Sequence, residues 1–268
     1  MNKTKLLANS IRKSALEMVV RAKASHIGSA LSIADIIAVL YSEILKFDSH
    51  DPKLADRDRF ILSKGHACVS VYAALCHVGF ISKNEILTYG EDFSNLMNHI
   101  SHKVPGVEFS TGSLGHGLPF GTGKALAAKR LGLAWRTFVL LSDGELGEGS
   151  NWEAIMFAGH HKLDNLVAII DYNKLQSLAT VKETLNIEPI VEKFRAFAWS
   201  VCEVDGHDYD AINSALSSVP WGEEKPSMLI AHTVKGKGVS WMENKVEWHY
   251  KTPSSEQLQM ALSELEHA

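Results

Sequence analysis

Apolar and polar residues follow two periods along this chain, one typical of helices and one typical of buried strands. Apolar side chains recur every three or four residues over 4–24, which predicts an amphipathic N-terminal helix. Short runs rich in Val, Ile and Leu predict strands over 60–62, 137–142, 165–171, 200–205 and 227–233. Further helices are expected over 32–45, between residue 66 and Gly79, and over 82–89, 117–131, 148–162, 189–198, 208–218 and 255–266.

The order of these elements predicts the class of fold. Strands alternate with helices, and the strands are apolar along their whole length, so both faces of the sheet are expected to be buried. The sequence therefore predicts a three-layer α/β/α sandwich with a mainly parallel sheet, preceded by an N-terminal helical segment. No internal repeat or long linker divides the chain, so we expect residues 1–268 to form a single domain.

Composition narrows the class of protein. The 268 residues are 46% apolar, enough for a substantial core, and a net charge of −4 without a basic tract argues against a nucleic-acid partner. Three cysteines form neither a metal-type spacing nor an even disulfide set. Charges interrupt the first twenty residues, and no apolar run reaches membrane-spanning length. We expect a soluble, cytoplasmic protein without a membrane partner.

Two predicted strand ends carry side chains suited to a metal ion. The strand over 137–142 leads into Asp143, and the strand over 165–171 leads into Asn173. In an open parallel sheet, ligands bind beyond the carboxyl ends of the strands. Oxygen ligands suit Mg²⁺, which usually leaves positions for phosphate oxygens, so we expect a magnesium-diphosphate anchor. The plainer interpretation is a helix cap at Asp143 and a turn at Asn173.

A glycine-rich segment over 111–117 precedes a predicted helix. Close backbone approach and free N–H groups at a helix start make such a segment suitable for holding phosphate. Glycine-rich connections are common in α/β proteins, so the segment alone does not distinguish a phosphate site from an ordinary structural loop. Beside Asp143 and Asn173, it supports a diphosphate site.

The metal motif resembles that of a known family. Ser-Asp-Gly at 142–144, followed by Asn173, is similar to the thiamine diphosphate signature GDG…N. Glu148-Gly149 and the sequence Trp-Glu-Ala at 152–154 resemble the version found in transketolases. The resemblance covers 21–253 and is nearest to the N-terminal subunit of a split transketolase. Ser142 replaces the first glycine of the motif and is expected to reshape the turn while the metal site persists.

The resemblance implies a role for each matching residue. It implies that Mg²⁺ binds the side chains of Asp143 and Asn173 and the main-chain carbonyl of Leu175. The contacts that it implies for thiamine diphosphate are His66, Gly112, Ser113, Leu114, Gly144, Glu145, Asn173 and His249. It places Glu148 and Glu153 at the subunit interface between two active sites, although acids on a helix are ordinarily solvated.

Three of the thirteen histidines lie in segments similar to family motifs. His66, in Ser-Lys-Gly-His, resembles a histidine that approaches the diphosphate. His26, in Ser-His-Ile-Gly, resembles a substrate-channel histidine, with Ile27 in place of the usual proline. His249 belongs to a closing segment near cofactor and substrate. There Tyr250 stands where glycine is common, so we expect a narrower substrate side.

A fourth family histidine precedes a Pro-Gly-Val-Glu stretch, here at 105–108. His99 and His102 both could take its place, and His99 needs the smaller gap. The resemblance implies that His26, His66, His99 and His249 orient substrate hydroxyls and relay protons. A near-neutral pKa is expected to suit them to this work.

The resemblance also implies a group that this chain lacks. In the family, a glutamate that activates thiamine diphosphate lies on a pyrimidine-binding domain, and the chain ends about where that domain would begin. We expect a separate C-terminal subunit to supply the glutamate in an α2β2 assembly. The implied activity, in carbohydrate metabolism, transfers a two-carbon ketol unit from a ketose or ketose phosphate to an aldose. The sugars and their pathway are not specified by these residues.

Two other functions fit the metal motif. One is the α-type subunit of another thiamine diphosphate enzyme, a 2-oxo acid dehydrogenase or decarboxylase, which shares the signature. The pair Gly65-His66 and the segment 113–115 favour transketolase instead. The other is a non-catalytic subunit that binds Mg²⁺-diphosphate only for assembly, against which the histidines argue.

Overall fold

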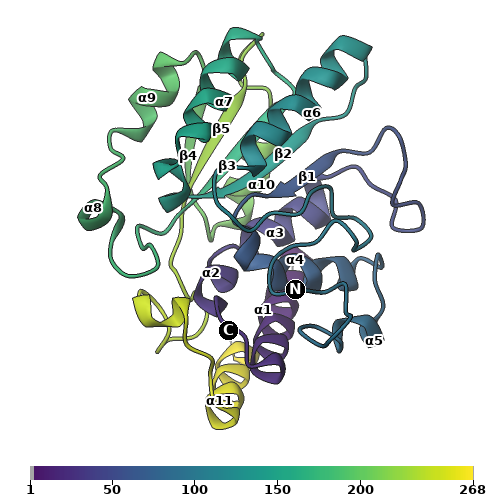
Figure 1. Cartoon of the computed structure of the whole chain (residues 1–268), viewed down its shortest axis with the longest axis vertical. Coiled ribbons are helices and arrows are strands. Elements are labelled where there is room, and N and C mark those ends of the chain that lie inside the picture. The colour runs from purple at the N-terminus through teal and green to yellow at the C-terminus, as the bar shows by residue number, and fades with distance from the viewer. Residues whose placement is uncertain (1–2, 268) are drawn as a thin grey trace.

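The computed structural model describes residues 3–267 and shows a five-stranded sheet between layers of helices (Figure 1). The strand order is β1-β2-β3-β5-β4, and every neighbouring pair is parallel. The strands are β1 (Arg59–Leu62), β2 (Thr137–Ser142), β3 (Leu166–Tyr172), β4 (Ser200–Asp205) and β5 (Ser227–His232). The predicted strands and the parallel α/β sheet are confirmed.

Helices fill the connections between the strands and extend both ends of the chain. They are α1 (Lys3–Ala22), α2 (Ile27–Ser32), α3 (Ala34–Val39), α4 (Cys68–His77), α5 (Lys83–Ile86), α6 (Gly117–Leu131), α7 (Gly149–His160), α8 (Val181–Thr184), α9 (Ile190–Ala196), α10 (Tyr209–Ser217) and α11 (Ser255–Glu266). Shorter helical turns are the π-helix η1 (Leu40–Ile44) and the 3₁₀ turns η2 (Gly65–Ala67), η3 (Gly144–Gly147) and η4 (Val246–His249).

The helix predicted over 32–45 corresponds to α3 and η1, which follow each other directly from Ala34 to Ile44, whereas α2 was not predicted. The chain forms α2, breaks at Ile33, forms α3 and widens into η1, where the N–H of Leu45 donates to the carbonyl of Leu40 at 2.8 Å. Residues 27–41 are buried on all sides. A segment without a polar face carries no helical period in its sequence, so packing sets its boundaries.

Alternate residues of the central strands face two separate hydrophobic cores. Phe138 and Leu140 of β2 pack in the core that includes residues of α1, α3, α4 and α10. Val139 and Leu141 pack in the core that includes residues of α6, α7 and α9, the helices on the viewer's side of the sheet in Figure 1. This period of two is what a strand buried on both faces requires. Within the described range, no helix is both long and apolar enough to cross a bilayer.

The connections beyond β1, β2 and β3 converge at one edge of the sheet. Ser142 pairs with Asp171 in the β2–β3 register, so the residues after these strands emerge together. The glycine-rich segment lies against the end of β1, where a Cβ on Gly65 would lie 2.3 Å from the carbonyl oxygen of Thr111. A Cβ on Gly117 would lie 2.3 Å from the hydroxyl of Ser63. Glycine is needed at both positions because the two backbones approach so closely.

Candidate active site

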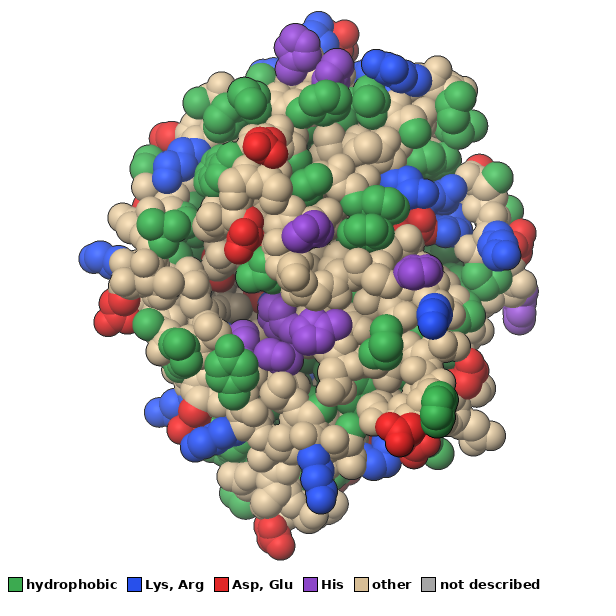
Figure 2. Space-filling view, viewed as in Figure 1, with side chains coloured by type: hydrophobic (Ala, Val, Ile, Leu, Met, Phe, Trp, Pro, Cys, Tyr) green, Lys and Arg blue, Asp and Glu red, His purple; other side chains and the backbone are tan. Residues whose placement is uncertain are grey.

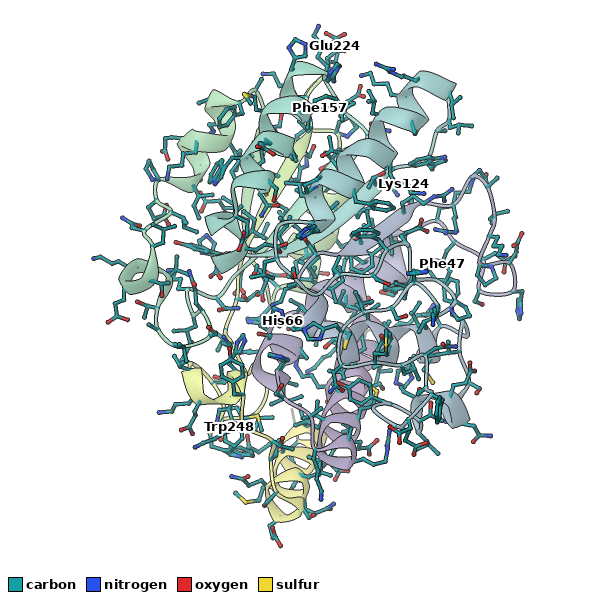
Figure 3. All side chains as sticks on the ribbon, viewed as in Figure 1. Phe47, His66, Lys124, Phe157, Glu224 and Trp248 are labelled. Atoms are coloured by element: carbon teal, nitrogen blue, oxygen red, sulfur yellow. The ribbon has the colours of Figure 1, made fainter. Side chains whose placement is uncertain are left out.

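A cavity of about 220 Å³ lies at the carboxyl edge of the sheet. Figure 2 shows histidines gathered around a hollow on this face, and Figure 3 places His66 where the sheet meets α2. The residues that line the cavity are His26, Ser29, Lys64, His66, His99, Gly112, Leu114, Ser142, Asp143, Gly144, Asn173, Leu175, Gln176, Ser177, Lys235, His249 and Tyr250. Sequence positions more than 200 residues apart thus share one cavity, as His26 and His249 do.

The three residues expected to hold a metal all line this cavity. The carboxylate of Asp143 accepts hydrogen bonds from the main-chain N–H groups of Gly144 at 2.7 Å and Lys174 at 2.6 Å. The Oδ1 of Asn173 accepts from the N–H of Leu175 at 3.0 Å. The carbonyl of Leu175 accepts from Nζ of Lys235 at 3.2 Å. Asp143 and Asn173 therefore do make the local turn contacts of the plainer interpretation, and they also face a shared cavity.

The chemistry of these donors fits a magnesium ion. Burial, and then the neighbouring Asp171 carboxylate, raises the pKa of Asp143 to about 7, so a bound cation would relieve a charge that the fold itself leaves poorly compensated. Between residues 3 and 267, no group of three or more His, Cys, Asp or Glu side chains could hold a metal ion. One carboxylate, one amide and one carbonyl suit Mg²⁺, which takes its remaining ligands from water and phosphate.

Four histidines form a cluster beside these donors. The ring of His26 lies 5.1 Å from that of His66, 5.9 Å from that of His99 and 4.8 Å from that of His249, between ring centres. His26 adopts a left-handed conformation with φ of 71°, and its N–H donates to the carbonyl of His249 at 2.8 Å. The hydrogen bond joins the segment before α2 to η4.

The expectation of near-neutral histidine pKa values is wrong for this ligand-free chain. Burial, followed by the positive charges of nearby groups, lowers the pKa of His26 to about 4 and that of His249 to about 3. Burial also lowers the pKa values of His66 and His99. The sequence could not reveal this shift, because burial, its largest cause, and the approach of Lys235 arise only through the fold.

The structure separates the two candidates for the fourth histidine. His99 lines the cavity beside Gly112, where an added Cβ would lie 3.6 Å from the His99 ring. His102 is exposed, and its Nδ1 is 2.7 Å from the hydroxyl of Ser110. Tyr250 lines the mouth of the cavity, with its ring centre 4.8 Å from that of His249.

Six of the eight predicted cofactor contacts line the cavity, namely His66, Gly112, Leu114, Gly144, Asn173 and His249, whereas two do not. Ser113 is exposed to solvent. Glu145 is buried behind the cavity, where its carboxylate accepts from the N–H of Gly115 at 2.8 Å and from the hydroxyl of Ser63. These contacts make Glu145 a link between loops and do not favour its prediction as a cofactor contact.

The acids predicted at a subunit interface are exposed in the single chain. Glu148 precedes α7 and Glu153 lies in its second turn, and both side chains face solvent. Glu153, together with Phe157, lines an apolar groove of about 330 Å³ between α6 and α7. The position of Glu148 and Glu153 at an interface stays a prediction.

Sequence reasoning missed several residues that line the cavity. Lys64 and Lys235 are each only 1% exposed, and both reach the cavity. Ser29 and Gln176 also line it. A signal was present for Lys64, which lies two residues before His66 in the segment Ser-Lys-Gly-His. The polarity of a lysine alone predicts an exposed side chain, so burial could not be foreseen.

The family of this chain follows from comparison with known proteins. Residues 3–264 match the family described as transketolase, thiamine diphosphate binding domain. The chain belongs to this family. The resemblance identified from the motifs is thereby confirmed.

Transketolase relatives agree with the match. The chain is 44% identical over 254 residues to a subunit of the apulose-4-phosphate transketolase of Phocaeicola vulgatus, covering 95% of this chain and 90% of that protein. It is 39% identical to 6-deoxy-6-sulfo-D-fructose transketolase subunit SqwG of a Clostridium species, covering 97% and 94%. Transketolase from Leishmania mexicana superposes with a TM-score of 0.94 at 30% identity, covering 99% of this chain and 42% of that enzyme. The chain therefore spans less than half of that transketolase, and the comparisons do not favour either alternative function.

Proposed function

We propose that this chain is the diphosphate-binding subunit of a two-subunit transketolase. The observation that carries the proposal is the convergence of Asp143, Asn173 and the Leu175 carbonyl in one cavity with four histidines. The chemistry that thiamine diphosphate supplies when bound is a nucleophilic carbon and an electron sink for breaking the bond beside a ketose carbonyl. Asp143, Asn173 and Leu175 would hold Mg²⁺ through oxygen atoms, and the magnesium would hold the diphosphate.

The charged and neutral groups of the cavity have separate tasks in this proposal. The buried ammonium groups of Lys64 and Lys235 place positive charge beside the diphosphate position. Nζ of Lys235 lies 3.1 Å from Nδ1 of His249. Because an ammonium group only donates, Nδ1 accepts and Nε2 of His249 carries the ring proton. Neutral histidines present both a donor and an acceptor, which suits them to orient sugar hydroxyls.

The proposal includes a partner that supplies the activating glutamate. The names of the two bacterial relatives each describe one subunit of a transketolase, which supports a partner for this chain, and the expected assembly is α2β2. The chain spans 42% of the Leishmania transketolase, which leaves room there for the pyrimidine-binding part. We place the assembly in the cytoplasm, where three free cysteines fit a reducing compartment.

Reconstitution tests this function. The chain is mixed with the pyrimidine-binding subunit, Mg²⁺ and thiamine diphosphate, and ketol transfer is followed with donors that include apulose 4-phosphate and 6-deoxy-6-sulfo-D-fructose. We expect turnover by the mixture and none by either protein on its own. Equal turnover by this chain without the second protein would refute the partner, and decarboxylation of a 2-oxo acid without ketol transfer would refute the activity.

A pair of variants tests the metal site. Asp143→Ala removes the carboxylate, and we expect thiamine diphosphate affinity to fall by more than ~100-fold, since replacing even a group behind a ligand commonly costs 10- to 100-fold. The control Asp164→Ala removes a surface carboxylate that pairs with Lys129 at 3.0 Å. Calorimetric titration measures both, and equal affinities would exclude Asp143 as a ligand.

A further inference from the structure

The side-chain amide of Asn173 has two ends of nearly the same shape. Only its oxygen can bind a cation, so its value as a ligand depends on which end faces the cavity. In the structure, the Nδ2 of Asn173 donates to Oδ2 of Asp171 at 3.0 Å. Oδ1 lies on the other side, where it accepts from the N–H of Leu175. The contact with Asp171 therefore decides the orientation of the amide.

Asp171 itself is fixed from several directions. Its Oδ2 also accepts from Nζ of Lys64 at 2.5 Å and from the hydroxyl of Ser32 at 2.7 Å, and its Oδ1 accepts from the hydroxyl of Thr233. Asp171 is 0% exposed. A carboxylate accepts through both oxygens and donates through neither, so it cannot pair with the oxygen of the Asn173 amide. If the Asn173 amide were inverted, its oxygen would face the Asp171 carboxylate, and neither group could donate a hydrogen bond.

The main chain of Asp171 contacts Asp143, a second proposed metal ligand. Asp171 pairs with Ser142 across β2 and β3, and its carbonyl accepts from the N–H of Asp143 at 3.3 Å. One buried residue thus touches Asp143 through its backbone and Asn173 through its side chain. Breaking a buried pair such as Lys64–Asp171 leaves a charge without its partner, so the pair keeps Asp171 in place.

We propose that Asp171, anchored by Lys64, is a positioning residue that turns the amide oxygen of Asn173 toward the cation. The inference rests on the proposed metal-diphosphate site and adds to it a residue that touches neither metal nor substrate. Partners behind metal ligands commonly change metal affinity 10- to 100-fold when they are replaced.

The test measures cation binding directly. Mn²⁺ serves as the probe, and electron paramagnetic resonance follows its binding to the full chain with thiamine diphosphate and the partner subunit. We expect Asp171→Asn to weaken Mn²⁺ affinity by about 10- to 100-fold. The matched control Asp164→Asn should change it by less than about twofold, because that ion pair lies on the surface.

A swapped pair separates orientation from general damage. In Asn173→Asp alone, two carboxylates would face each other, and Mn²⁺ affinity should fall. In the double variant Asp171→Asn with Asn173→Asp, the new amide can donate to the new carboxylate, and we expect at least a tenfold recovery relative to Asp171→Asn. A merely structural role for Asp171 predicts no recovery.

The outcomes distinguish this inference from the proposed function. If the unaltered complex binds no Mn²⁺ with thiamine diphosphate, the metal site fails and this inference fails with it. If the unaltered complex binds and a folded Asp171→Asn variant binds equally well, only the positioning role is overturned. If Asp171→Asn fails to fold, Thr233→Val tests the positioning role instead. This variant removes one hydroxyl donor to Asp171 and keeps the ion pair between Asp171 and Lys64. A two- to fivefold loss would support the role and unchanged affinity would overturn it.

Discussion

The cavity concentrates positive charge on a few buried residues at the scale of single side chains. Lys64 has Asp171 as a partner, whereas Lys235 donates to main-chain carbonyls and to His249. Burial, and then repulsion from Lys64, lowers the pKa of Lys235 to about 8. The diphosphate of the proposed complex would bring negative charge next to these two ammonium groups.

The neutral histidines predict a pH dependence of stability. The pKa of His249 is about 3 in the folded chain and ~6.5 in an unfolded chain. The contribution of this histidine to stability is therefore complete above pH ~6.5 and is lost as the pH falls toward its folded pKa. We expect the free energy of unfolding of the ligand-free chain to decrease between pH 6.5 and 4. His249→Asn should reduce the slope of the unfolding free energy against pH, because one group fewer takes up a proton on unfolding.

Urea unfolding at several pH values measures the slope. The control His160→Asn changes an exposed residue at the end of α7 and should leave the slope as it is. An unchanged slope in His249→Asn would mean that this histidine does not titrate differently in the two states.

At the scale of elements, the glycine-rich segment is joined to the sheet by side chains from three loops. Thr111 donates to the carbonyl of Leu62 at 2.6 Å, and Ser63 accepts from the N–H of Gly117 at 3.1 Å. Glu145 connects this segment to η3. Position 65 has no room for a side chain because Thr111 presses against it. The approach of these backbones sets one wall of the cavity.

A pair of glycine substitutions tests that wall. Gly65→Ala places a methyl group against backbone, so we expect a loss of stability of ~1–3 kcal/mol, with weaker thiamine diphosphate binding. Gly123→Ala, inside α6, meets nothing within 4 Å, and we expect a gain of ~0.5–1 kcal/mol. Thermal unfolding and calorimetry measure both. Equal effects of the two substitutions would contradict the close approach at Gly65.

The sequence predicted elements well where polar and apolar residues alternate clearly or where turns punctuate the chain. The strand over 137–142 and the helices over 117–131 and 255–266 match the structure. Helix α2 was not predicted, because residues 27–32 are all buried and show no polar face. The short helix α8 was missed as well, although Thr180 and Glu183 form a capping box that signals its start.

At the scale of the whole molecule, the sequence predicted those residues of the site that belong to recognisable motifs. Asp143, Asn173 and the four histidines come from recognisable segments, and the fold brings all six to one cavity. The pairing of Lys64 with Asp171 joins residues 107 positions apart, which no local pattern reveals. The prediction of a single domain is supported by one sheet shared between both cores, and we infer one domain from it.

The exposed face beside α7 predicts how the assembly responds to a change of charge. If Glu153 lies between subunits, Glu153→Lys should weaken association of the complex by tenfold or more, because a reversed charge at an interface is repelled. The free chain should change in stability by less than ~0.5 kcal/mol, since the residue is exposed. Sedimentation measures association. Glu192→Lys on α9 is the control, and equal behaviour of the two variants would remove Glu153 from the interface.

The ammonium group of Lys235 has a consequence for the loop after β3. It donates to the carbonyls of Leu175 and Gln176 and so secures that loop from within. The backbone that carries one proposed metal ligand, the Leu175 carbonyl, is therefore held in place by a side chain of the protein itself.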